Sequence, residues 1–268
     1  MKKTFAVTAF VFAASAAFAV PTVNGVLTDS DYTTPVVSNA INSGYGPHGI
    51  VSLRTFRDAT DLYVGLSGTA EGNGNNFRLV VGRVNTPTGI QSGTALTGGN
   101  DGLSPFSGFN RVLAADADLA VRFSGAGGGT STNGFVSVIN YRTGLTEVVG
   151  ADVFIGNPTN GTAVTQATGF ATGVSVAYTP GATYPTEGNA GVEIKIPLAA
   201  IGATASDALE LFAVQGGGGG ANISWSFVPG VLGYNTYDTV DFNALAPTQK
   251  ITVAGTASIA GDTWKMFD

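Results

Sequence analysis

Carboxylates and aromatic rings are the side chains of this protein best suited to catalysis or ligand binding, because the sequence has no cysteine and only one histidine. That histidine, His48, lies between a proline and a glycine, where we expect an exposed loop residue rather than the base of a nucleophilic triad. Two carboxylates could form a glycosidase pair, but Glu193 and Glu210 occupy strand positions typical of solvent or of a sheet edge. We therefore predict that the protein is not an enzyme.

Calcium is the inorganic ligand to consider, because oxygen-rich side chains cluster in several turns. Two acidic pairs have a suitable composition: Asp29 with Asp31, and Asp116 with Asp118. Aspartates are also abundant in turns simply because their side chains accept backbone hydrogen bonds. The turn interpretation is favoured for both pairs, calcium is the alternative, and no other cofactor is expected.

Aromatic rings in loops indicate a binding surface more strongly, since a ring stacks on the apolar face of a sugar at little entropic cost. Five rings lie in glycine-rich or polar segments: Tyr45, Phe106, Phe109, Tyr234 and Tyr237. Simple loop packing accounts equally well for Tyr234 and Tyr237. We predict that these rings contribute to a surface that binds glycan or another cell-surface component.

Strands must position these loops, because apolar residues recur at every second position far more often than at helical spacing. The alternation is found at residues 62–66, 77–81, 119–123, 136–138, 174–176, 192–196, 223–227 and 251–253. Polar residues between the apolar ones would face water, which predicts two antiparallel sheets with one wet face each. Residues 209–214 are apolar at odd and at even positions, except for Glu210, so both faces of this strand are expected to be buried. The segment predicts a central strand. One helical turn is expected at 198–202.

The expected core follows from the same alternation. We predict burial of Val192, Ile194, Ile196, Leu209, Leu211, Ile223, Trp225 and Phe227. The fold class is therefore an all-β antiparallel sandwich.

Residues 1–19 have the composition of an export signal. Lys2 and Lys3 precede an apolar run, and Ala17, Phe18 and Ala19 form the small-x-small site cut by signal peptidase. The apolar run is shorter than the ~20 residues of a membrane-spanning helix, and no second one follows. We predict a signal peptide over 1–19, a single domain over 20–268, no transmembrane helix, and a secreted protein located outside the cell or on its surface.

Charge limits the partners. The formal net charge is −6, and removal of Lys2 and Lys3 would make it more negative, so nucleic acid is a poor candidate. Only 11% of residues are charged, against ~25% in an average soluble domain. Edge strands with few charges are poorly protected against pairing with a second copy. A self-assembling structural protein of the surface or extracellular matrix is therefore one alternative. An outer-membrane β-barrel is another, although its strands of ~9 to 11 residues exceed most of these runs.

Three short segments resemble landmarks of one superfamily: Asn-Gly-Val-Leu-Thr at 24–28, Asp-Leu-Tyr-Val-Gly-Leu at 61–66, and Gly-Val-Glu-Ile-Lys-Ile-Pro at 191–197. They are similar to the family-nine carbohydrate-binding modules and DOMON-like domains, and residues 209–242 resemble secreted bacterial proteins with the same landmarks. The resemblance implies a jelly-roll-like sandwich and a binding role. The tryptophans that clamp sugar in the characterised modules have no match here.

Overall fold

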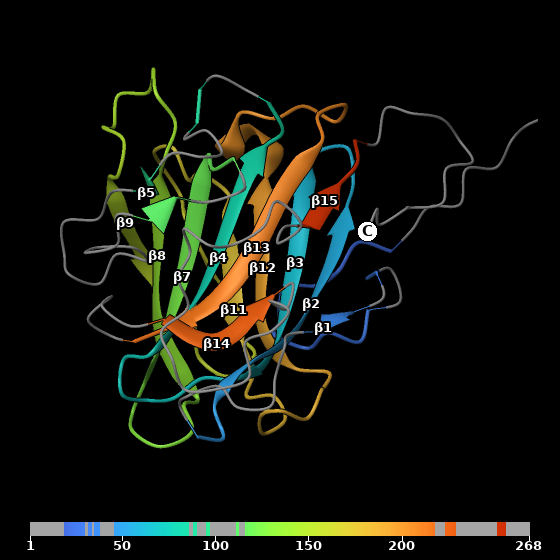
Figure 1. Cartoon of the computed structure of the whole chain (residues 1–268), viewed down its shortest axis with the longest axis vertical. Coiled ribbons are helices and arrows are strands. Elements are labelled where there is room, and N and C mark those ends of the chain that lie inside the picture. The colour runs from blue at the N-terminus through green and yellow to red at the C-terminus, as the bar shows by residue number, and fades with distance from the viewer. Residues whose placement is uncertain are drawn as a thin grey trace, which may run out of the picture.

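The computed structural model describes residues 19–29, 32–33, 35–37, 46–85, 88–89, 95–96, 111–112, 116–217, 223–228 and 251–255. In this part of the chain every regular element is a β-strand, apart from one 3-10 turn. Two antiparallel sheets pack face to face, and neither closes on itself (Figure 1). The predicted all-β sandwich is confirmed. The predicted signal peptide lies outside the described residues except for Ala19, and it stays a prediction.

The first sheet has six strands in the order β1-β2-β3-β12-β11-β10. Their bounds are β1 (Val36–Val37), β2 (Gly49–Arg57), β3 (Asp61–Thr69), β10 (Val164–Thr165), β11 (Ser175–Tyr178) and β12 (Gly191–Pro197). β3 and β12 form its centre, with Leu66 opposite Val192 and Leu62 opposite Ile196. Because residues opposite each other share a face, these apolar pairs form one wall of the core.

The second sheet has the order β14-β13-β4-β7-β8-β9, and β15 also pairs with β13. Its strands are β4 (Asn76–Arg83), β7 (Leu119–Ala126), β8 (Asn133–Asn140), β9 (Asp152–Gly156), β13 (Leu209–Gly216), β14 (Ile223–Val228) and β15 (Ile251–Val253). β13 is buried along its whole length, as the apolar run predicts. Two further short strands, β5 (Ala95–Leu96) and β6 (Arg111–Val112), pair only with each other.

The core lies between the two sheets. Phe123 of β7 and Tyr178 of β11 meet across the layers with ring centroids 4.5 Å apart. The predicted core residues are buried at Val192, Ile194, Ile196, Leu209 and Leu211, while the side chains of Ile223, Trp225 and Phe227 lie outside the described part of the chain. The predicted turn is η1 (Leu198–Ile201), and Gly202 ends it with a positive φ of 69°.

The prediction of one wet face per sheet is wrong. Outward positions of β4, β7, β8 and β13 also carry apolar residues and are fully buried: Val80, Ala120, Ile139 and Phe212. Glu193 and Glu210 are buried as well, at 0% and 4% exposure, rather than lying in solvent. They occupy outward positions on opposite sheets, so the structure does not bring them together. His48 is likewise buried and not an exposed loop residue.

One further feature concerns membranes. Within the described ranges, no helix is long and apolar enough to cross a bilayer.

Candidate functional site

All five of the rings predicted for binding fall outside the described part of the chain. This applies to Tyr45, Phe106, Phe109, Tyr234 and Tyr237, and to Asp31 of the first acidic pair. The binding role of these rings stays a prediction. The described candidates are Asp29, Asp116 and Asp118.

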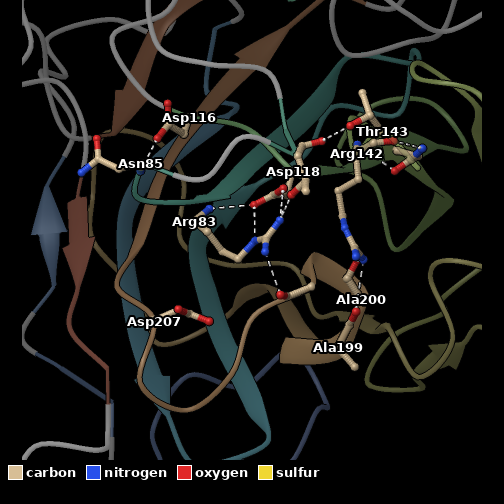
Figure 2. A network of polar contacts seen from close by, with 12 residues as sticks. Arg83, Asn85, Asp116, Asp118, Arg142, Thr143, Ala199, Ala200 and Asp207 are labelled. Atoms are coloured by element: carbon tan, nitrogen blue, oxygen red, sulfur yellow. Dashed lines mark hydrogen bonds and ion pairs between the residues drawn. The ribbon is translucent and has the colours of Figure 1, made fainter. Parts of the chain in front are cut away.

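Asp118 binds an arginine (Figure 2). Its Oδ2 accepts from the backbone N–H of Arg83 at 2.8 Å and from Arg83 Nε at 3.0 Å, and its Oδ1 accepts from Nη2 at 2.9 Å. The hydrogen bond to Asp118 raises the pKa of the Arg83 guanidinium. Calcium at this position would therefore have to displace a guanidinium from a carboxylate that is 1% exposed.

The other described aspartates accept backbone hydrogen bonds. Asp116 Oδ2 accepts from the N–H of Asn85 at 2.7 Å, and Asp29 Oδ2 accepts from the N–H of Thr22 at 2.8 Å. The donors lie 31 and seven residues away along the chain, so these contacts are not those of a local turn, and the turn interpretation stays a prediction. Among the described residues, no group of three or more His, Cys, Asp or Glu side chains could hold a metal ion.

The arginines around Asp118 join the two sheets at one end of the sandwich. Arg83, at the end of β4, donates from Nη1 to the carbonyl of Gly202 at 2.8 Å. Arg142 follows β8 and donates from Nη1 to the carbonyls of Ala199 and Ala200 at 3.3 and 3.2 Å (Figure 2). The carbonyl of Ala199 also accepts from the N–H of Gly202, so Arg142 adds a second donor there. Both guanidiniums thus reach from the second sheet to the carbonyl groups of η1 and its cap. We assign this cluster to the stability of the fold.

A second polar centre lies on the outer face of the first sheet, under what we call the N-terminal segment, the described residues 19–29 and 32–33. Glu193 Oε2 accepts from the N–H groups of Asn24 and Gly25 at 2.8 and 2.9 Å, and Oε1 accepts from the Tyr32 hydroxyl at 2.6 Å. Burial raises the pKa of Glu193, although these hydrogen bonds oppose the shift. These three donors to the carboxylate all come from the N-terminal segment, which therefore explains why an outward glutamate is buried.

The same segment is fixed by an apolar contact. Leu27 is 1% exposed and lies on Gly65 of β3, where a Cβ atom would come within 2.7 Å of Leu27 Cδ2. Its N–H donates to the carbonyl of Asn189 at 2.7 Å, and its carbonyl accepts from Arg54. Glycine at 65 therefore leaves the space that the leucine fills. The segments 24–28, 61–66 and 191–197, which are separate in the sequence, meet at this place.

The exposed feature best suited to ligand binding is a pair of rings on β8 and β9, which we call the aromatic pair: Phe135 and Phe154. They are 47% and 57% exposed. Their centroids lie 6.4 Å apart, with the ring planes inclined by 46°. Phe135 pairs with Ser124 and Phe154 with Ser137, which places both rings on the outer face of the second sheet. Two further exposed apolar residues, Val148 and Val149, lie in the connection between these strands.

The alternation of apolar residues does not predict the aromatic pair. Outward strand positions are expected to be polar, and Phe135 holds such a position beside Val136. Phe154 lies in a five-residue segment, Asp152–Gly156, that is too short for a clear period. An aromatic residue at a water-facing position was the available signal.

Comparisons with known proteins give this chain no relative: no family model, no curated protein and no solved structure matches it. The resemblance to the family-nine carbohydrate-binding modules and DOMON-like domains therefore stays a prediction.

Proposed function

We propose that the protein is a secreted, non-catalytic binding protein that recognises a neutral cell-surface glycan through the aromatic pair. The exposure of Phe135 and Phe154 on adjacent strands carries this proposal. Rings held on strands are already ordered, so little conformational entropy is lost when a ligand stacks on them. Phenylalanine has no polar group, and the contact would use the apolar C–H face of a sugar.

Charge supports a neutral ligand over a sulfated or phosphorylated one. The formal net charge is −6, which repels anionic polymers. Three of the arginines, Arg57, Arg78 and Arg122, are at most 2% exposed and are not offered to a ligand. Arg57 is used internally and donates to backbone carbonyls, including those of Asp207 and Thr204.

The predicted resemblance supports the same class of function. It implies a sandwich with a binding role, and the sandwich is the part of that expectation that the described strands bear out. The aromatic pair is the structural observation behind the binding role.

A glycan array tests the proposal. Wild-type protein should bind one or more neutral glycans, and Phe135→Ala and Phe154→Ala should each weaken binding by ~1 to 2 kcal/mol. Val26→Ala serves as the control, because Val26 is also exposed, at 37%, but lies in the N-terminal segment on the other sheet. Wild-type protein that binds no glycan would contradict the proposal.

The same array tests the loop prediction. Tyr234→Ala and Tyr237→Ala, measured with and without calcium, should reduce binding if the loops contribute to the surface. Loss of binding in these variants, with none in the aromatic-pair variants, would move the site from the strands to the loops.

A further inference from the structure

The spacing of the aromatic pair limits how a sugar can contact it. A sugar held between two rings needs a carbon contact of about 3.5 to 4 Å on either side, so the ring centroids would have to lie about 7 to 8 Å apart. The centroids of Phe135 and Phe154 are 6.4 Å apart. A sugar therefore does not fit between the rings and has to lie over them.

The inclination of the rings sets a second limit. Their planes are inclined by 46°, so the two ring faces point in different directions and one flat ligand surface cannot lie on both. A phenyl ring and a pyranose ring are both six-membered and match in size, so each ring face accommodates one sugar unit. Because both rings are exposed, the pair has room for two sugar units that are turned relative to each other.

Exposed polar groups lie at the Phe135 end of the pair. A Cβ atom at Gly134 would come within 2.6 Å of the Phe123 ring, so Gly134 faces the core, and Asn133 and Phe135 both point outward. Thr159 forms a bridge with Asn133 and shares its face of the sheet. Asn133 and Thr159 are exposed, and no hydrogen bond of either side chain is found among the described residues.

The polar side chains beside Phe154 on the same face are buried instead. Ser137, opposite Phe154, is 3% exposed, and its hydroxyl accepts from Arg122 Nη2 at 3.0 Å. The carboxylate oxygens of Asp152, two residues before Phe154, are buried as well. A sugar on Phe154 would therefore be held by stacking, whereas a sugar on Phe135 also has an amide and a hydroxyl beside it.

We propose that the aromatic pair binds two adjoining units of one neutral glycan chain, one unit on each ring, and that Asn133 and Thr159 hydrogen-bond the unit on Phe135. This inference rests on the proposed function and specifies its ligand. The ligand is a chain of two or more sugars, rather than a single sugar or the flat surface of a crystalline polysaccharide.

The chemistry of Asn133 and Thr159 suits this role. A sugar hydroxyl both donates and accepts hydrogen bonds, and so do an asparagine amide and a threonine hydroxyl. Asn133 precedes Phe135 by two residues, or roughly 7 Å along the strand, so its amide lies near the rim of a sugar stacked on that ring. The apolar rings supply the contact area, and the polar pair distinguishes one arrangement of hydroxyl groups from another.

Isothermal titration calorimetry of the wild-type protein tests the length of the ligand. The probes are glucose, galactose, mannose and N-acetylglucosamine, each as the monosaccharide and as its 1,4-linked di- and trisaccharides in both anomeric forms. In a series that binds, the disaccharide should bind about tenfold or more tightly than the monosaccharide, because it stacks on a second ring. The trisaccharide should add little. Microcrystalline cellulose and chitin should retain no protein in a pull-down.

Variants assign the two sugar units to the two rings. Phe154→Ala should lower the affinity for the disaccharide to about that for the monosaccharide, which removes the length dependence. Asn133→Ala should weaken binding of monosaccharide and disaccharide alike, by about threefold to tenfold, through loss of hydrogen bonds to the first unit. Asn160→Ala is the matched control, because Asn160 is an equally exposed type of residue in the turn that follows Thr159, and it should change neither affinity.

The outcomes separate this inference from the proposed function. A monosaccharide that binds as tightly as its disaccharide overturns the inference and leaves the proposed function standing. A length dependence that Phe154→Ala leaves in place also overturns it, since the second sugar would then lie elsewhere, and so does retention on crystalline cellulose or chitin. Wild-type protein that binds none of the probes and no glycan on the array contradicts the proposed function itself.

Discussion

Glu193 and Phe154 hold outward positions on opposite sheets, and their exposures are the reverse of what their chemistry suggests. The glutamate is 0% exposed and the phenylalanine is 57% exposed. The difference lies in what covers each position. The N-terminal segment supplies two backbone N–H groups and a hydroxyl to Glu193, whereas Phe154 lies at the last strand of its sheet. Strand parity sets the direction of a side chain, and the covering chain sets its exposure.

This comparison separates two kinds of surface on one sandwich. Where the chain crosses a sheet, outward residues become part of a second, smaller core, with Leu27 on Gly65 as its apolar contact. At β9 the outward ring remains available, and an exposed ring on an ordered strand is suited to binding. If the N-terminal segment packs on the first sheet, changes there should lower the free energy of unfolding strongly. If Phe154 is exposed, its removal should lower it little.

The largest effect is expected from Leu27→Ala. Leu27 is 1% exposed, so its removal should lower the free energy of unfolding by ~2 to 5 kcal/mol through lost burial and the cavity on Gly65. Its neighbour Val26 is 37% exposed, and Val26→Ala should cost only about 0.5 kcal/mol. Denaturant unfolding of both variants measures the difference. Equal costs would mean that the N-terminal segment does not pack on the first sheet.

A smaller, pH-dependent effect is expected from Glu193→Gln. Burial raises the pKa of Glu193 in the folded chain, so the folded state binds more protons than the unfolded state between the ordinary and the raised pKa. The glutamate therefore makes the protein less stable as the pH rises through that window, with a slope of at most about 1.4 kcal/mol per pH unit. Below this pH window the protonated carboxyl is neutral, as the glutamine is, so the two proteins should show the same dependence of stability on pH.

The measurement is the free energy of unfolding of both proteins from acid to neutral pH. The gap between Glu193→Gln and wild type should move in favour of the glutamine as the pH rises. A gap that moves the other way would show that the hydrogen bonds from Asn24, Gly25 and Tyr32 outweigh the cost of burial. Tyr32→Phe separates these contributions, because it removes one donor and leaves the carboxylate buried.

Much of the sandwich could be predicted from the sequence, because its central strands alternate over five or more residues. Residues 62–66, 119–123 and 192–196 are the clearest cases and belong to β3, β7 and β12, inside the two sheets. β9 was missed because three consecutive apolar residues in a short segment have no period. The outer faces were wrongly predicted to be solvent-exposed. They are covered by segments far away in the sequence, as Asn24 covers Glu193, and the sequence around a strand does not reveal such contacts.

The candidate sites were harder to predict. Asp116 and Asp118 were predicted as turn residues or calcium ligands, and nothing local to them indicates that Arg83, 35 residues from Asp118, binds its carboxylate. The aromatic pair depends on a cross-strand register with a shift between Val136 and Ser137, and such a register is a property of the sheet rather than of either strand.

The smallest effect is expected from Phe154→Ala, and it tests whether the aromatic pair serves binding rather than the fold. Phe123 is the matched control, because it is the same residue type in the same sheet and is 1% exposed. Phe123→Ala should lower the free energy of unfolding by ~3 to 5 kcal/mol. Phe154→Ala should lower it by only about 0.5 to 1 kcal/mol, the worth of its contact with Phe135. Thermal and denaturant unfolding of both variants measures the two costs. A cost for Phe154→Ala as large as that for Phe123→Ala would make the ring part of the core and remove the reason to assign it a ligand.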